Sequence, residues 1–224
     1  ITALTCGLEE AANLRATSVT AAPDGLRFTV NDRTEYFIPV LGKYNVVNAL
    51  AAVAIGMRFR MTPEEIAAGL QNVKLPPMRM QRSVLGDITL INDAYNANPS
   101  SMRIALGVMD GLPQPGRRVL VLGDMRELGM ESTRCHQALG QDAGRSTAQL
   151  IVAVGAYARI VADGATATAG TTKRIYAFPT VEAAAEKIGS LLEPGDIVLL
   201  KASRGMKLER LVPHIESAVG LART

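Results

Sequence analysis

Residues 88–102 read Ile-Thr-Leu-Ile-Asn-Asp-Ala-Tyr-Asn-Ala-Asn-Pro-Ser-Ser-Met, and this stretch decides the fold that the sequence predicts. An apolar strand, Ile88–Ile91, leads directly into a cluster of small polar side chains, and Pro99 stands just inside a predicted helix start. In open α/β sheets, ligands bind where a strand ends and the chain passes into a helix. The stretch therefore predicts an α/β fold with a nucleotide site at this loop.

The alternation of strand and helix continues to the end of the chain. Strands are expected at 88–92, 118–122, 149–154, 174–177 and 196–200, and helices at about 100–110, 132–144, 156–163, 181–192 and 205–219. Strands that are apolar almost throughout, as in 118–122, are typical of a parallel sheet covered by helices on both faces. We expect such a sheet in this part of the chain.

The first part of the chain has a different pattern. We expect a hairpin with strands at 26–30 and 36–40, and Pro39 places its second strand near a sheet edge. An Ala-rich, buried helix is expected over 45–59. The next helix begins after Thr62, a good N-cap that is followed by Pro63 and Glu65.

Leu75-Pro76-Pro77 is the best candidate for a linker, because the pattern changes there. The chain is thus expected to consist of two parts, residues 1–78 and 79–224. A length of 224 residues allows one large domain or two small ones. The first residue is Ile rather than Met, so we expect a piece of a longer protein.

Composition narrows the class of protein. Hydrophobic residues make up 48% and charged residues 20%, as in an ordinary soluble globular protein. The net charge of +3 is dispersed, which argues against a nucleic-acid groove. No apolar run approaches the ~18 residues that span a bilayer, and we expect no signal peptide. Cys6 and Cys135 lie far apart, which suggests reduced thiols in a cytoplasmic protein.

A Gly-Lys pair at residues 42–43 invites a phosphate-loop interpretation, but Tyr44 stands where the loop needs Ser or Thr. No phosphate loop occurs elsewhere in the sequence. Asn45 and Asn48 instead lie on one face of a helix start, and their amides match the edge of an adenine ring. The alternative is that one of them only caps the helix.

Two further candidates for a nucleotide site follow the linker. Arg79 suits contacts to phosphate or ribose, although it is also explained as a surface arginine. Asp93, at a strand end, suits the hydroxyls of a ribose, and Tyr95 suits packing on a base. Asn96 and Asn98 are expected to hold the loop through bonds from side chain to backbone. The alternative for the whole loop is a structural turn.

Two other loops carry charge at strand ends. Asp124 and Glu127, bracketed by glycines, suit an amine or a cation, and a solvated loop is the alternative. Lys201, Ser203 and Arg204 open the last predicted helix and would form an anion site, with a simple helix cap as the alternative. His136, in the helix between these loops, is expected to be structural.

Together these segments resemble the Mur ligases of peptidoglycan synthesis. The match rests on five stretches: 45–52, Arg79 with its neighbours, 92–102, 122–129 with Glu131 and His136, and 201–204. The Tyr-Asn-Ala-Asn and Gly-Asp-Met-x-Glu-Leu-Gly motifs resemble the branch that adds D-alanyl-D-alanine, whereas sister ligases carry a loop of the Asp-Tyr-Ala-His type. Tyr44 departs from the family, which usually has His there.

The resemblance implies an α/β protein in which residues 1–78 are the tail of a central ATPase domain and residues 79–224 a C-terminal Rossmann-like domain. It implies ATP and Mg²⁺ as cofactors, with most Mg²⁺ ligands outside this sequence. ATP would be bound by Asn45, Asn48, Arg79, Asp93 and Tyr95. The other substrates would be bound by Asn96, Asn98, Asp124, Glu127, Lys201, Ser203 and Arg204. It singles out no catalytic residue and no metal ligand in this chain.

In such ligases ATP phosphorylates the carboxylate of UDP-N-acetylmuramoyl-tripeptide, and the amine of D-Ala-D-Ala then attacks the acyl phosphate. These two molecules are the partners that the resemblance implies, with no nucleic acid, no membrane insertion and a monomer in the cytoplasm. We expect this fragment to be inactive alone, because the phosphate loop and the UDP-binding domain are missing. The alternatives are a nucleotide- or peptide-binding module without catalysis and a ligase like folylpolyglutamate synthetase, against which the Tyr-Asn-Ala-Asn loop argues.

Overall fold

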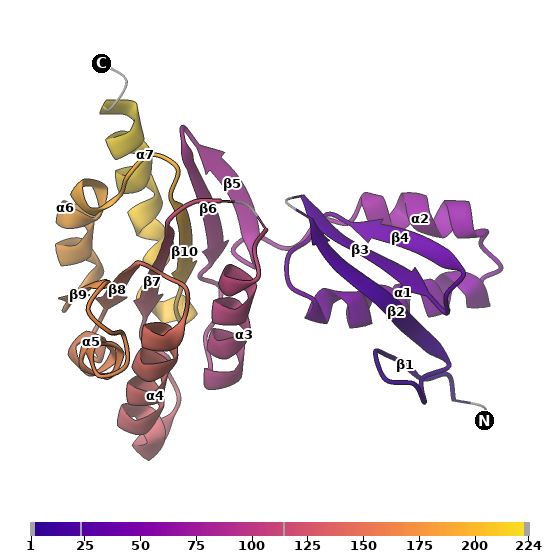
Figure 1. Cartoon of the computed structure of the whole chain (residues 1–224), viewed down its shortest axis with the longest axis horizontal. Helices are drawn as coiled ribbons and strands as arrows, with labels where there is room; N and C mark the ends of the chain where they lie inside the picture. The colour runs from indigo at the N-terminus through magenta and orange to yellow at the C-terminus, as the bar shows by residue number, and fades with distance from the viewer. Residues whose placement is uncertain (1–2, 23, 114, 222–224) are drawn as a thin grey trace. The chain divides into compact units, whose positions relative to one another are not determined.

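The structure is a computed structural model that describes residues 3–22, 24–113 and 115–221 (Figure 1). Residues 1 and 2, the start of the first predicted part, lie outside the described residues. The chain divides into two compact units, with the main division between Leu75 and Pro76, and a short segment that begins at Gly111 is grouped with the first unit. The main division lies within the segment predicted as a linker.

The first unit contains a sheet in the order β1-β2-β3-β4 and two helices. Its elements are β1 (Cys6–Gly7), β2 (Leu14–Ala22), β3 (Gly25–Val30), β4 (Thr34–Ile38), α1 (Tyr44–Arg58) and α2 (Pro63–Gln71). The predicted hairpin is confirmed as β3 and β4, and β4 lies at the edge of the sheet, as Pro39 predicted. Val46, Leu50 and Val53 of α1 are buried with strand residues in the core of this unit.

The start of α2 confirms the predicted helix signal. The Thr62 hydroxyl accepts a hydrogen bond from the backbone N–H of Glu65 at 3.2 Å, and the Glu65 carboxylate accepts one from the N–H of Thr62 at 2.8 Å. Pro63 occupies the first helical position, where a missing N–H costs nothing. This reciprocal cap fixes the helix start at the residue that the sequence indicated.

The second unit is built on a mixed sheet in the order β5-β6-β10-β7-β8-β9. Its strands are β5 (Gln81–Leu85), β6 (Ile88–Asp93), β7 (Arg118–Gly123), β8 (Leu150–Val154), β9 (Arg174–Phe178) and β10 (Ile197–Lys201). The helices between them are α3 (Pro99–Asp110), α4 (Ser132–Arg145), α5 (Ala158–Thr166) and α6 (Val181–Leu191). The strands from β6 to β10 pair in parallel, so the predicted α/β fold is confirmed.

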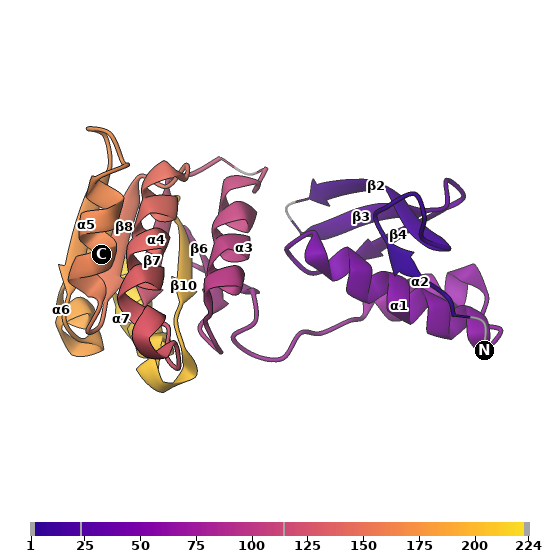
Figure 2. The same cartoon turned by 90° about the horizontal axis from the view of Figure 1, so that it is seen from below.

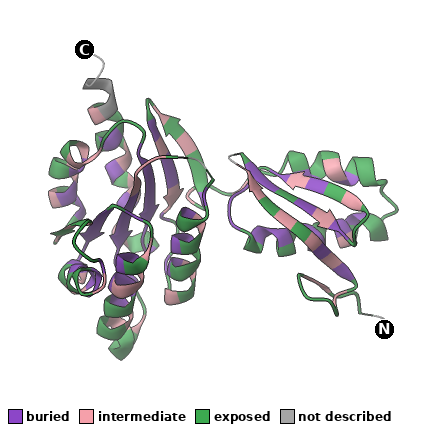
Figure 3. Cartoon of the chain, in the orientation of Figure 1, coloured by how far each residue is buried: buried purple, intermediate pink, exposed green. Residues whose placement is uncertain are grey.

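Helices cover both faces of this sheet, as Figures 1 and 2 show. On one face α4 packs between α3 and α5, and on the other α6 packs against α7 (Val212–Leu221). Alternate strand residues such as Val121, Val152 and Val198 join the core under α6 and α7. Every residue of β8 and β10 is buried (Figure 3), which explains why these strands are apolar almost throughout.

Two features of this unit differ from the prediction. Strand β5 was not expected, and it pairs antiparallel to β6 at the edge of the sheet, where its polar residues face solvent. The single helix predicted at 205–219 is wrong: the chain forms two 3-10 turns, η2 (Arg204–Met206) and η3 (Leu208–Leu211), before α7. Lys207 between them is left-handed, with φ +53°. Pro213 lacks the N–H that a helix running through it would need, so α7 begins only at Val212.

A buried ion pair ties the starts of two central strands together. Arg117 donates from Nε and Nη2 to the two carboxylate oxygens of Asp196, at 2.8 and 2.7 Å. Its other contacts are Glu193 Oε1 at 2.7 Å and the Leu191 carbonyl at 2.9 Å. Hydrogen bonding to Asp196 raises the pKa of Arg117 above its ordinary value. Arg117 therefore satisfies a carboxylate whose side chain is fully buried.

We predict that Arg117→Met lowers the free energy of unfolding by about 3 kcal/mol, because the Asp196 carboxylate then remains buried without its partner. Urea denaturation measures this change. As a matched control, Arg210→Gln removes the same charge but breaks only an exposed ion pair with Glu182, and should give no resolvable change. Equal losses in the two variants would contradict the role given to Arg117.

Candidate functional site

The carboxyl ends of three adjacent strands form the candidate site. β10 lies between β6 and β7, and its last residue, Lys201, pairs in register with Asp93 on one side and Leu122 on the other. β6 leads into α3 on one face of the sheet, whereas β10 leads toward α7 on the opposite face. The chain thus switches faces here, the point at which α/β sheets bind ligands.

The loops that the sequence singled out follow these three strands. These loops and the strand residues that lead into them contain nine of the residues predicted to bind ligands: Asp93, Tyr95, Asn96, Asn98, Asp124, Glu127, Lys201, Ser203 and Arg204. A tenth, Arg79, lies in the turn before β5. Asn45 and Asn48 lie in the first unit. The fold therefore gathers one group of predicted site residues at a single edge of the sheet of the second unit.

A buried ion pair joins the ends of β6 and β10. Lys201 is 2% exposed, and its ammonium contacts Asp93 Oδ2 at 2.5 Å and the Asn96 carbonyl at 3.1 Å. The other carboxylate oxygen, Asp93 Oδ1, accepts the backbone N–H of Met80 at 3.0 Å. Both oxygens of Asp93 thus already have protein partners. The contact of Asp93 with a ribose stays a prediction, and a ribose hydroxyl would have to share these oxygens with the protein partners.

Ser203 links all three loops. Its hydroxyl accepts the backbone N–H of Arg126 at 2.8 Å and donates to the Ala97 carbonyl at 3.3 Å, and its own N–H donates to the Asp124 carbonyl at 3.0 Å. Ser203 makes no side-chain cap, so the simple helix-cap alternative is wrong. The turn that follows, η2, spans three residues and is too short to supply the helix dipole expected there.

Asp124 closes the loop after β7 against the start of α5. Its carboxylate oxygens accept the backbone N–H groups of Ala156 and Tyr157 at 2.8 and 3.0 Å. Gly155 has φ +121°, and a Cβ there would come within 2.5 Å of the Asp124 carboxylate, so only glycine fits. Asp124 is buried and satisfies orphan donors of a helix start, while its predicted contact with an amine remains untested.

His136 holds the same loop from below, which confirms its expected structural role. Its Nε2 accepts the backbone N–H of Met125 at 2.9 Å, and Nδ1 contacts the Ser132 carbonyl at 2.7 Å. The ring is fully buried and stacks on Tyr157, with centroids 4.2 Å apart. Because one nitrogen must accept and the other donate, these contacts fix a neutral imidazole with its proton on Nδ1.

Arg79 and Tyr95, predicted to share a site, lie together in the structure. The Arg79 guanidinium carbon is 4.2 Å from the centroid of the Tyr95 ring, a cation–π contact. The Tyr95 N–H donates to the Met78 carbonyl at 3.1 Å. Met78 and Met80 on either side of Arg79 are left-handed, with φ +59° and +48°. Such backbone is uncommon outside glycine, and here it turns the chain so that Arg79 lies on the ring.

The asparagines of the loop after β6 act on the backbone, as expected. Asn98 and Ser101 form a reciprocal cap of α3: Asn98 Oδ1 accepts the Ser101 N–H at 2.8 Å, and Ser101 Oγ accepts the Asn98 N–H at 3.0 Å. Asn96 Oδ1 accepts the Ala97 N–H at 2.8 Å. Glu127, in the neighbouring loop, is exposed on left-handed backbone, with φ +64°.

In the first unit, Asn45 and Asn48 share a face of α1, as predicted. The Asn48 amide donates to Asn45 Oδ1 at 3.1 Å, and Asn45 Nδ2 donates to the Leu41 carbonyl at 2.7 Å. The alternative that one of them caps the helix is wrong, because the N-cap is Lys43 and makes no side-chain bond. Asn45 is buried, whereas Asn48 remains exposed.

The sequence did not indicate two charged residues of the site. Arg204 Nη1 contacts Glu209 Oε1 at 2.5 Å and the Met78 sulfur at 3.6 Å. Glu209 was hidden inside the helix wrongly predicted at 205–219. Arg126 occupies a variable position within a recognised motif, so nothing in the pattern drew attention to it. Both residues belong to the loops that Ser203 joins.

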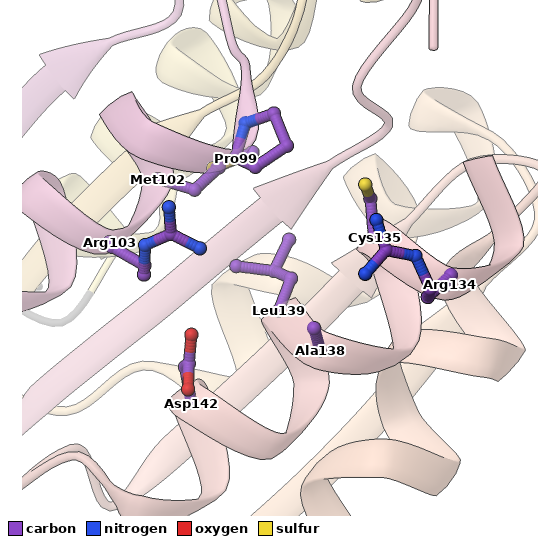
Figure 4. A pocket seen from close by; sticks show the side chains of 8 residues that line it. All are labelled: Pro99, Met102, Arg103, Arg134, Cys135, Ala138, Leu139 and Asp142. Atoms are coloured by element: carbon purple, nitrogen blue, oxygen red, sulfur yellow. The ribbon is translucent and has the colours of Figure 1, made fainter. Parts of the chain in front are cut away.

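A separate pocket of about 260 Å³ lies between α3 and α4 (Figure 4). It is lined by Pro99, Met102, Arg103, Arg134, Cys135, Ala138, Leu139 and Asp142. None of the residues predicted to bind ligands is among them. The partly exposed Cys135 thiol at this pocket is a free cysteine.

Within residues 3–22, 24–113 and 115–221, no group of three or more His, Cys, Asp or Glu side chains is arranged to hold a metal ion. No helix in this part of the chain is long and apolar enough to cross a membrane.

Comparison with known proteins places these loops in a family. The family model described as "Mur ligase, glutamate ligase domain" matches residues 78–204. The UDP-N-acetylmuramoyl-tripeptide–D-alanyl-D-alanine ligase of Bacillus subtilis (strain 168) is 35% identical over 199 residues, which is 88% of this chain and 43% of the relative. The enzyme of the same name from Escherichia coli (strain K12) is 33% identical over 205 residues, 90% of this chain and 44% of the relative.

Solved structures agree with these relatives. A crystal structure of MurF from Acinetobacter baumannii superposes with a TM-score of 0.82 at 30% identity, covering 93% of this chain and 46% of that one. Folylpolyglutamate synthase of Mycobacterium tuberculosis, complexed with ADP, shares the fold at 15% identity, with a TM-score of 0.67, over 91% of this chain and 48% of that one. The chain therefore spans less than half the length of these proteins.

We predict that the ion pair at the strand ends is energetically coupled. Lys201→Met should lower the free energy of unfolding by about 3 kcal/mol, because it leaves the largely buried Asp93 without a counter-charge. Asp93→Leu should cost a similar amount. In the double variant the loss, measured by urea denaturation, should be at least ~1 kcal/mol smaller than the sum of the single losses. Simple additivity would show that the two groups do not interact.

We also predict that His136→Leu loosens the loop after β7. The variant removes the acceptor of the buried Met125 N–H, which should cost about 1–3 kcal/mol, and hydrogen exchange at the Met125 amide should speed up. Cys135→Ala, one residue away and partly exposed, serves as the control and should leave that amide protected. Unchanged exchange at Met125 in His136→Leu would refute the assignment.

Proposed function

Because the chain belongs to the Mur ligase family, we propose that it is the C-terminal part of an ATP-dependent ligase that joins D-alanyl-D-alanine to UDP-N-acetylmuramoyl-tripeptide. The supporting observation is the convergence of the loops after β6, β7 and β10 at one sheet edge. These loops carry the two motifs that separate this branch from its sister ligases. The curated relatives that bear this name match 88% and 90% of this chain.

The nucleotide side of the proposed site centres on Arg79 and Tyr95. The guanidinium lies over the ring and makes no ion pair with an Asp or Glu in the described part of the chain, so its donors can contact phosphate or ribose oxygens. A relative of known structure from Thermotoga maritima, 18% identical, is described in complex with ADP, which agrees with a nucleotide substrate in this fold. Asn45 and Asn48 would contribute their amides to the adenine.

In this proposal Asp93 positions the nucleotide site, whereas the sequence predicted that it contacts the ribose directly. Its carboxylate is bonded to the Lys201 ammonium and the Met80 N–H, so it positions the turn that carries Arg79. Contact with the ribose would have to share those oxygens, which have further lone pairs. The effect of Asp93 on nucleotide binding would therefore act partly through Arg79.

The proposed chemistry consists of two balanced steps. An oxygen of the tripeptide carboxylate takes the terminal phosphoryl group of ATP, which releases ADP and leaves an acyl phosphate. The amine nitrogen of D-Ala-D-Ala then bonds to the carbonyl carbon, the C–O bond to phosphate breaks, and the nitrogen loses a proton. Both steps build up negative charge, which positioned cations at the strand ends would stabilise.

The dipeptide side of the site would be formed by the loops after β7 and β10. Glu127 is exposed there and suits the ammonium of an incoming amine, while Asn96, Asn98, Asp124 and Ser203 hold the loops in place. Lys201 and Arg204, which the resemblance assigns to the substrates, each contact an acidic side chain of the protein. Magnesium would assist phosphoryl transfer, and we expect its ligands in the part of the relatives that lies beyond this match.

The cellular setting is part of the proposal. A ligase that uses a nucleotide-linked muramoyl peptide and ATP would work in the cytoplasm, and we expect a monomer. A second candidate is a binding module that kept the fold and lost catalysis.

The decisive experiment assays the complete protein encoded around this chain for ADP release. The ligase proposal predicts release that requires both UDP-N-acetylmuramoyl-tripeptide and D-Ala-D-Ala, while the 224-residue chain alone shows none. A complete protein that binds ADP without turnover would favour the binding module. Release that depends on a glutamate instead of the dipeptide would point to another branch.

Within that assay we predict that Arg79→Gln raises the KM for ATP about tenfold and leaves the KM for D-Ala-D-Ala unchanged, because a charge-assisted hydrogen bond to the nucleotide is lost. The control is Arg159→Gln, which removes the same charge from an exposed pair on α5. An unchanged KM for ATP in Arg79→Gln would remove Arg79 from the nucleotide site. Equal increases for both substrates would indicate a structural effect instead.

A further inference from the structure

We propose that the Arg126 guanidinium recognises the carboxylate of the amine substrate and so sets specificity for a substrate that carries one. The inference rests on the proposed function and deepens it, because it names the cation of the dipeptide side. It also moves that role from Lys201 and Arg204, where the sequence placed it, to a residue at the variable position of the motif after β7.

The argument begins with the cations at the strand ends. Lys201 is buried and its ammonium is held by Asp93 and a backbone carbonyl. Arg204 is paired with Glu209, whose second oxygen is itself buried with no hydrogen-bond partner in the described part of the chain. A substrate carboxylate would have to compete with a protein carboxylate for either group, and leaving a buried carboxylate unpaired is costly.

Arg126 lies beside these residues without such a partner. Its side chain is exposed, and among the described residues it makes no ion pair with any Asp or Glu. Its backbone is nevertheless fixed, because the Arg126 N–H donates to the Ser203 hydroxyl at 2.8 Å. The side chain therefore starts from a rigid point between two of the loops.

The position of the guanidinium depends on a glycine. A Cβ built on Gly205 would lie 2.3 Å from Arg126 Nη1 and 2.8 Å from its Cζ, so the guanidinium rests directly on the Gly205 backbone. Gly205 does not have the left-handed backbone that requires glycine, so the obstacle to a larger residue is the arginine. Because Gly205 has no side chain, the Arg126 guanidinium can occupy this position.

The opposite charges of Arg126 and Glu127 suit a zwitterionic ligand. A guanidinium offers a planar fork that binds both oxygens of a carboxylate. Glu127, the next residue, is exposed and makes no ion pair in the described part of the structure, so it provides an opposite charge for an ammonium. D-Ala-D-Ala carries both groups, whereas a nucleotide carries no ammonium.

The test is isothermal titration of the complete protein that contains this chain with D-Ala-D-Ala, with D-alanyl-D-alaninamide, which lacks the carboxylate, and with ADP. Arg126→Gln should raise the Kd for D-Ala-D-Ala about tenfold and leave the Kd for the amide and for ADP unchanged. Arg210→Gln, which removes the same charge from an exposed pair with Glu182, should change none of the three.

Gly205→Ala provides a second variant that leaves the charge unchanged. It should weaken D-Ala-D-Ala binding to a similar extent by displacing the guanidinium, and adding it to Arg126→Gln should cost nothing more. Circular dichroism confirms that each variant is folded. Binding of D-Ala-D-Ala that is the same in Arg126→Gln as in the native chain would overturn the inference while the proposed function stands.

Two other outcomes are equally clear. Equal loss of the dipeptide and its amide in Arg126→Gln would show that the residue does not read the carboxylate. If the native chain binds ADP but not D-Ala-D-Ala, the dipeptide side of the proposed function fails, and the inference fails with it.

Discussion

The ion pair between Lys201 and Asp93 is the interaction on which the rest of the site depends. It joins the ends of two adjacent strands, and the same aspartate holds the turn at Met80 while the same lysine holds the loop at Asn96. An ammonium that is 2% exposed has no water to replace these partners. Its hydrogen bonds must therefore all be present together, and this requirement fixes the loops relative to the sheet.

Most of the polar side chains at the strand ends serve the protein before they serve a ligand. Asp124 holds the turn before α5, Asn98 caps α3, and Ser203 joins three loops. A structural role does not exclude a role in binding, because a ligand site needs side chains that are already held in position. Among the charged side chains at the strand ends, Arg79, Arg126 and Glu127 make no ion pair in the described part of the chain, and these three are the ones that can bind a ligand.

The strands were predictable from sequence because burial on both faces leaves almost only apolar residues, as in β8 and β10. Strand β5 was missed since an edge strand exposed to solvent carries no such pattern. The last helix was placed too early because periodicity ignored the constraint of Pro213. The site residues could be listed from the motifs, but the pairing of Lys201 with Asp93 spans 108 positions and depends on sheet order. No sequence pattern predicted the contact of the Arg126 guanidinium with Gly205.

The sheet order has a consequence for biosynthesis. Among the described strands of this sheet β10 leaves the ribosome last, yet it lies between β6 and β7, which pair with it and not with each other. Until β10 is synthesised, the edges of β6 and β7 that it pairs with stay exposed, and exposed apolar strand edges favour aggregation and chaperone binding. A premature stop codon shortly before Ile197 would remove the middle of the sheet and not its margin. For this domain a late truncation is as damaging as an early one, and cellular proteases would clear the product.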